Sequence, residues 1–133
     1  MACGEFGEGK MTEPNEIIRQ IEAYFLNFNK TKKFKALVTA GPTYEYIDPV
    51  RFITNKSSGK QGFELAKALS KKGFETTLIS GPTNLKINND INLIQVETAE
   101  EMFKSTQNNL PVDVAIFSAA VADFKIKEKN KEK

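Results

Sequence analysis

The hydrophobic positions of the chain follow a repeating order from residue 34 onward, in which short apolar runs alternate with longer amphipathic stretches. The apolar runs favour strands that are buried on both faces of a parallel sheet. The amphipathic stretches carry apolar residues at helical spacing and predict helices packed on that sheet. The predicted strands are 34–39, 74–80, 93–96 and 112–118, and the predicted helices are 57–72 and 99–108.

This alternation predicts the fold class, an α/β protein with a Rossmann-like open parallel sheet. Right-handed crossovers give the strand order 3-2-1-4, so the first and fourth predicted strands end side by side at the topological switch point. The outer edge of the fourth strand has no predicted neighbour, and the sheet is expected to be incomplete. Met102 and Leu110 are expected on the buried side of the second helix of this region.

The first 33 residues have a different pattern. Residues 1–13 have no hydrophobic period and predict a loop. A helix is predicted from Pro14, with one apolar stripe that reaches Phe28, and residues 27–33 are polar and basic, as in a linker. The chain is therefore divided into residues 1–33, with loop, helix and linker, and residues 34–133, which form the sheet domain.

The connection at 39–62 is rich in glycine and runs from the first strand to the next helix. Gly41 follows the strand, and Ser57, Ser58 and Gly59 precede the helix, whose free N–H groups and dipole suit a phosphate group. The alternative is an ordinary helix capped by Ser57 or Ser58. The connection has no G-x-G-x-x-G motif and no complete Walker A motif, which disfavours a plain P-loop enzyme and a nicotinamide-dependent reductase.

The segment after the fourth strand, Ser118 to Asp123, is expected to meet this connection. The small side chains of Ala119 and Ala120 suit either a ligand lying against the backbone or tight helix packing. Asp123 suits Mg²⁺ or a polar base edge, and equally the cap of a following element.

Three further side chains are candidates for chemistry. The amide of Asn55 is able to hold a carbonyl or acyl-phosphate group, or to shape a turn. Arg51 is expected to bind a phosphate or carboxylate, or to pair with Asp48. Cys3 is either a proton donor or nucleophile, or a plain free thiol.

Composition narrows the classes of function. The 133 residues include one cysteine and no histidine, which excludes internal disulfides, histidine metal sites and Ser-His-Asp triads. The net charge of +2 gives no argument for nucleic acid. No apolar stretch is long enough for a membrane span, and nothing resembles a signal peptide, so a cytoplasmic location is expected.

Long motifs carry a resemblance to a known family. A-G-P-T-x-E-x-I-D-P-V-R-F-I-T-N-K-S-S-G-K-Q-G, then I-S-G-P and S-A-A-V-A-D-F, resemble the phosphopantothenoylcysteine synthetase domain of the bifunctional proteins of coenzyme A biosynthesis. This resemblance runs from about Lys35 to the end of the chain. The earlier segment A-C-G-E-F-G-E-G-K-M-T-E-P is similar to the end of the FMN-dependent decarboxylase domain of the same proteins.

The resemblance implies a ligase reaction. CTP activates the carboxylate of 4′-phosphopantothenate as an acyl-cytidylate, and the amine of L-cysteine then displaces CMP. Asn55 would handle the acyl-cytidylate, and Asp123 would lie near the base or a cation such as Mg²⁺. Arg51 is kept as the candidate substrate-binding residue from the argument above. The resemblance implies that Ser118, Ala119, Ala120 and Asp123 bind the nucleotide. The phosphate-binding argument for the connection adds Gly41, Ser57, Ser58 and Gly59 to the expected nucleotide-binding residues. Cys3 would be the proton donor of the decarboxylase, whose FMN-binding part is not in this chain.

The family pattern extends beyond this sequence, which holds only the start of a lysine-rich motif at 131–133. The chain is therefore expected to be a fragment of the bifunctional protein, with a second copy or a separate C-terminal half as its partner. The alternative function is a non-catalytic nucleotide-binding module that needs this C-terminal half.

Overall fold

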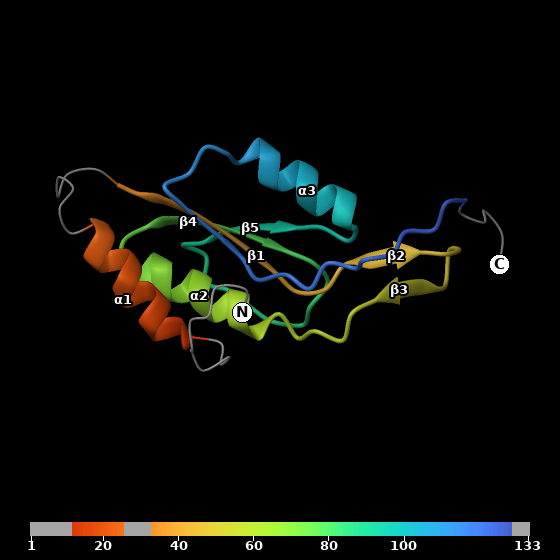
Figure 1. Ribbon diagram of the computed structural model, residues 1–133, viewed down its shortest axis with the longest axis horizontal. Coiled ribbons are helices and arrows are strands. Elements are labelled where there is room, and N and C mark those ends of the chain that lie inside the picture. The colour runs from red at the N-terminus through yellow and green to blue at the C-terminus, as the bar shows by residue number, and fades with distance from the viewer. Residues whose placement is uncertain (1–11, 26–32, 129–133) are drawn as a thin grey trace, which may run out of the picture.

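The computed structural model describes residues 12–25 and 33–128, which form three layers with a parallel sheet in the middle (Figure 1). The sheet has the order β5-β4-β1-β6, which confirms the predicted α/β class and strand order. Neighbouring strands are all parallel, so their carboxyl ends share one edge. The four strands are β1 (Lys35–Ala40), β4 (Glu75–Ser80), β5 (Asn92–Gln95) and β6 (Val114–Phe117).

Two helices cover one face of the sheet and one helix covers the other (Figure 1). β1 is central and is buried from Ala36 to Ala40, because helices lie on both of its faces. Ala36, Val38 and Ala40 belong to the apolar cluster under α2, and Leu37 belongs to the cluster under α3. The helices are α1 (Pro14–Phe25), α2 (Lys60–Lys71) and α3 (Ala99–Asn108).

The helix predicted from Pro14 is present as α1, with proline at its first position. Its apolar stripe joins the cluster under α2, where Ile18 is buried and Phe25 packs on the rings of Phe34 and Phe74. Phe28, at the predicted end of the stripe, lies outside the described residues. No helix in the described parts of the chain is long and apolar enough to cross a membrane.

The sequence pattern predicted no strand in the connection between β1 and α2, and the structure corrects this expectation. The connection contains an antiparallel hairpin of β2 (Tyr44–Tyr46) and β3 (Phe52–Thr54), which projects beyond the sheet (Figure 1). The turn is held by Asp48, whose Oδ1 accepts the N–H groups of Val50 at 2.8 Å and Arg51 at 2.7 Å. Each strand has only three residues, too short for an alternating pattern to be recognised.

The end of α3 corrects a second expectation. Met102 is buried as predicted, but Leu110 is 47% exposed. The helix stops at Asn108, and the Asn109 side chain donates to the carbonyl oxygen of Ser105 at 2.8 Å. Leu110 therefore lies past the helix, where helical spacing no longer decides its direction.

Candidate functional site

The two unusual segments meet at the carboxyl edge of the sheet, as the strand order predicted. Pro42 and Ala120 form a parallel bridge, and the N–H of Ala120 donates to the carbonyl oxygen of Gly41 at 2.8 Å. Two residues earlier in each segment, the Ser118 hydroxyl donates to the carbonyl oxygen of Thr39 at 2.8 Å. The ends of β1 and β6 are thus joined by backbone and side-chain bonds.

The start of α2 differs from the prediction in its capping residue. The cap is Gly59, with φ of 74° and no side-chain cap bond, and not Ser57 or Ser58. Only glycine fits, because a Cβ at Gly59 would lie 3.1 Å from the Gly41 Cα and this φ is left-handed. The two serine hydroxyls accept instead from the N–H groups of Gly59 and Lys60, each at 3.3 Å.

A repeated tripeptide builds this edge and was not used in the sequence-based prediction. Gly41-Pro42-Thr43 ends β1, and Gly81-Pro82-Thr83 ends the neighbouring β4. The two turns interlock: a Cβ at Gly81 would lie 1.6 Å from the Pro42 carbonyl oxygen, and one at Gly41 would lie 2.9 Å from Thr83 Cγ2. The repeat is visible in the sequence and would have placed Pro82 and Thr83 beside the predicted phosphate site.

Asn55 links the hairpin to the segment after β6. It directly follows β3, and its side-chain nitrogen donates to the carbonyl oxygens of Ala120 at 3.3 Å and Val121 at 2.9 Å. The Thr43 hydroxyl reinforces the link by accepting the N–H of Ala122 at 2.9 Å. The amide that was predicted to touch a ligand therefore has a defined orientation.

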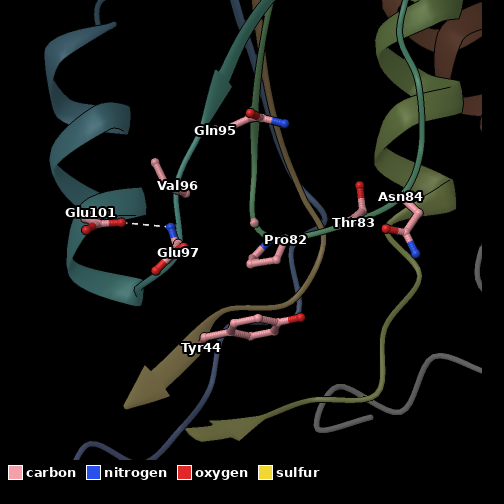
Figure 2. A pocket seen from close by; sticks show the side chains of 9 residues that line it. Tyr44, Pro82, Thr83, Asn84, Gln95, Val96, Glu97 and Glu101 are labelled. Atoms are coloured by element: carbon pink, nitrogen blue, oxygen red, sulfur yellow. Dashed lines mark hydrogen bonds between the residues drawn. The ribbon is translucent and has the colours of Figure 1, made fainter. Parts of the chain in front are cut away.

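Two cavities lie at this edge. The first, about 550 Å³, is lined by side chains that suit an anion or a carbonyl group, from Asn55, Lys56, Ser57 and Ser58. The second, about 460 Å³, is lined on one side by the carboxylates of Glu97 and Glu101. Figure 2 shows the second cavity, with Tyr44 and Pro82 between these glutamates and the pair Thr83 and Asn84. Tyr44 and Pro82 line both cavities and so separate them.

Several predicted residues lie at this edge without lining either cavity. Ser118 uses its hydroxyl on Thr39, and the Ala119 N–H donates to the Thr39 hydroxyl at 3.4 Å. Gly41 and Ala120 are likewise held in the backbone bonds that join β1 to the segment after β6. These residues support the cavity walls in the structure, and their predicted contact with a nucleotide stays a prediction.

Two other predicted residues, Asp123 and Arg51, do not line the cavity with the serines. Asp123 lines a separate cavity of about 100 Å³ with Glu45, Glu100 and Lys125. No group of three potential metal ligands occurs in the described residues, and the metal role of Asp123 stays a prediction. Arg51 forms an ion pair with Asp48 at 2.6 Å, which was one of the two roles expected for it. Cys3 lies outside the described residues.

Two groups near the hairpin have shifted pKa values. The N–H groups of Val50 and Arg51, and then the Arg51 guanidinium, lower the pKa of Asp48 because they stabilise its carboxylate. The pKa of Tyr46 is raised, first by its hydrogen bond to Glu97 and then by burial and by nearby negative charge. Glu97 thus gives the second cavity an anionic wall.

Comparison with known proteins relates the chain to pantothenate metabolism. Residues 31–133 match the family described as "DNA/pantothenate metabolism flavoprotein C-terminal domain". The coenzyme A biosynthesis bifunctional protein CoaBC of Haemophilus influenzae is 42% identical over 133 residues, which cover 99% of this chain and 33% of that protein. A cysteine/cysteine sulfinic acid decarboxylase of an unknown prokaryotic organism is 45% identical, covering 93% of this chain and 36% of that protein.

A solved structure shares the fold. The crystal structure of the C-terminal domain of a coenzyme A biosynthesis bifunctional protein CoaBC is 46% identical, with a TM-score of 0.67. The match covers 72% of this chain and 50% of that one. The chain spans about one third of the length of the first curated relatives, and the resemblance to bifunctional proteins of coenzyme A biosynthesis is confirmed at this level.

The ligase function expected from the sequence is contradicted by these findings. The matching family is described as a flavoprotein of pantothenate metabolism, and a relative that matches 93% of the chain is a decarboxylase. CTP and Mg²⁺ are accordingly not assigned as cofactors. The relation to enzymes of coenzyme A biosynthesis stands.

The flavin that the family description implies fits the described residues only in part. The start of α2 and the serine hydroxyls suit the phosphate of FMN. The three-ring system would need a flat apolar slot, and the apolar lining of the first cavity is confined to Pro42, Tyr44 and Pro82. The first cavity therefore does not form a complete FMN site.

Proposed function

Because the chain belongs to the family of DNA/pantothenate metabolism flavoprotein C-terminal domains, we propose that it binds a phosphorylated pantothenate compound as part of a bifunctional enzyme of coenzyme A biosynthesis. The compounds concerned are 4′-phosphopantothenate and its conjugate with L-cysteine. That the whole enzyme acts in coenzyme A biosynthesis is part of this proposal. The division of the chain into residues 1–33 and a domain at 34–133 is also proposed.

The first cavity carries the proposal. It opens beside the start of α2, where the positive end of the helix dipole favours a phosphate. Ser57 and Ser58, which carry hydroxyls, and Lys56, which carries an ammonium, line the same space. A phosphate bound there would be met by positive charge and by hydrogen-bond donors.

Asn55 gives the same cavity a second kind of contact. Its side-chain nitrogen donates to two carbonyl oxygens. Its side-chain oxygen then serves as an acceptor for an N–H or O–H group of the ligand. Pantothenate compounds carry amide and hydroxyl groups along their length. We propose that Asn55 accepts from one of these groups while the phosphate lies at the serines.

Calorimetric titration of the chain tests the proposal. The expected result is that 4′-phosphopantothenate binds at least about tenfold more tightly than pantothenate, because only the former carries the phosphate. The double variant Ser57→Ala/Ser58→Ala should lose about tenfold in affinity for the phosphorylated compound. Ser105→Ala, on α3, is the matched control and should bind as the wild type does. Equal affinity for both compounds would refute the phosphate site.

A further inference from the structure

The β2–β3 hairpin holds a buried carboxylate that the proposed site does not use. Glu45, in the middle of β2, is 5% exposed. Its Oε1 accepts the N–H of Ala99, the first residue of α3, at 2.8 Å. A carboxylate at this place is favoured by the helix dipole, and it satisfies an N–H that has no partner within the helix.

The residues on both sides of Glu45 hold the same loop. The N–H of Tyr44 donates to the carbonyl oxygen of Glu97 at 2.7 Å, and the Tyr46 hydroxyl donates to Glu97 Oε2 at 2.8 Å. Tyr44 and Tyr46 therefore bind the short segment between β5 and α3, and Glu45 binds the first residue of α3. This segment is itself fixed by the capping box of Thr98 and Glu101.

The other strand of the hairpin leads directly to the proposed ligand. Glu45 pairs with Ile53 and Tyr44 with Thr54, and the next residue is Asn55. Asn55 and Thr43 then bind the backbone of residues 120–122. The hairpin is thus held at one side by the start of α3 and at the other by the segment after β6.

We propose that Glu45 is a positioning residue, which fixes the hairpin against the start of α3 and thereby sets the place of Tyr44 and Asn55 in the cavity wall. Its effect on ligand binding rests on the function proposed above. Its effect on the hairpin rests on the bond between Glu45 and Ala99 and on the strand pairing.

Amide hydrogen exchange followed by NMR tests the positioning role without any ligand. In Glu45→Ala, the amides of Tyr44 and Ala122 should exchange at least about tenfold faster, while the amide of Leu37 in β1 stays within about twofold. The side-chain amide signals of Asn55 should shift at the same time. Glu45→Gln keeps an acceptor for Ala99 and should stay within about threefold of the wild type. Glu64→Ala, an exposed glutamate on α2, is the control.

Two results would overturn the proposal. One is unchanged exchange at Tyr44 and Ala122 in Glu45→Ala, and the other is an equal increase at Leu37, which would show a loss of global stability only. If Glu45→Ala does not fold, Glu45→Asp provides the same comparison, because its shorter side chain keeps the charge without reaching Ala99.

The affinity for 4′-phosphopantothenate, measured on the same variants, should fall about tenfold in Glu45→Ala and recover in Glu45→Gln. Binding that is equal in both variants and the wild type would overturn the effect on the ligand. If the wild type itself binds no 4′-phosphopantothenate, the proposed function fails, while the exchange rates still decide the positioning role of Glu45.

Discussion

Gly62 lies in the first turn of α2 and is buried against the end of β1. A Cβ there would lie 2.4 Å from the Ala40 Cβ and 2.7 Å from the Ser118 hydroxyl oxygen. Alanine normally stabilises a helix by about 1 kcal/mol relative to glycine, but overpacking of this kind costs about 1–3 kcal/mol. We therefore expect Gly62→Ala to lower the free energy of unfolding, measured by urea denaturation.

Lys60→Ala, in the same helical turn and exposed, serves as the control for this prediction. It should change the free energy of unfolding by less than about 0.5 kcal/mol. A Gly62→Ala chain that is more stable than the wild type would show that α2 is able to move away from Ala40.

The lowered pKa of Asp48 makes the free energy of unfolding depend on pH. This pKa is lowered in the folded chain, chiefly by the N–H groups of Val50 and Arg51. The resulting stabilisation is complete above the unfolded pKa of about 3.9 and is lost as the pH falls through the lower folded value. Asp48→Asn removes this titration, so its free energy of unfolding should fall less steeply with acid. Parallel curves for the two chains below about pH 4 would contradict the prediction.

Among the elements, the hairpin depends on its aromatic side chains. The rings of Tyr44 and Phe52 stack with centroids 3.9 Å apart, and Tyr46 meets Phe52 edge-on at 5.7 Å. Phe52→Ala removes both contacts and should cost about 1–2 kcal/mol in the free energy of unfolding. Val50→Ala, at the exposed turn, should cost less than about 0.5 kcal/mol. Equal losses in the two variants would show that ring packing is not what holds the hairpin.

The elements also show what sequence reasoning is able to predict. The long elements were predicted, because β1 and β4 are short β-favouring runs that end at Gly-Pro turns and α2 and α3 have helical spacing. The hairpin was missed, since its strands are short and part of its stability comes from contacts of Tyr44 and Glu45 with Glu97 and Ala99, far away in sequence.

The candidate site was predicted to a similar extent. Strand order alone brings residues 39–62 and 118–123 together, and the structure confirms it. The predicted capping residue of α2 was wrong. Gly59 caps the helix in place of Ser58, and this choice depends on how closely Gly41 approaches position 59. Local capping preferences do not contain that distance.

For the molecule as a whole, the edge of β6 is the place where association is expected. Among the described strands, only β1 pairs with β6, and exposed strand edges favour pairing with another chain. Phe117 is 66% exposed and Phe124 is 74% exposed, which adds apolar surface at and beyond this strand. We propose that a second copy of the chain covers this surface.

Sedimentation velocity tests this association. The wild type should form a dimer that dissociates on dilution, and Phe117→Asp should remain monomeric under the same conditions. Phe103→Asp, on the exposed side of α3, is the control, since Phe103 is 62% exposed and lies on a helix away from the strand edge. A wild-type chain that is monomeric at every concentration would exclude the second copy as the partner.

The hairpin has a practical consequence for spectroscopy. The chain has no tryptophan and three tyrosines, and two of these, Tyr44 and Tyr46, stand in β2. Tyr46 donates to a carboxylate and Tyr44 lies on a phenylalanine ring, while Tyr24 on α1 is 70% exposed. One of the three intrinsic fluorophores, Tyr44, therefore stands in the wall between the two cavities. The unlabelled protein carries its own optical probe of events at that wall.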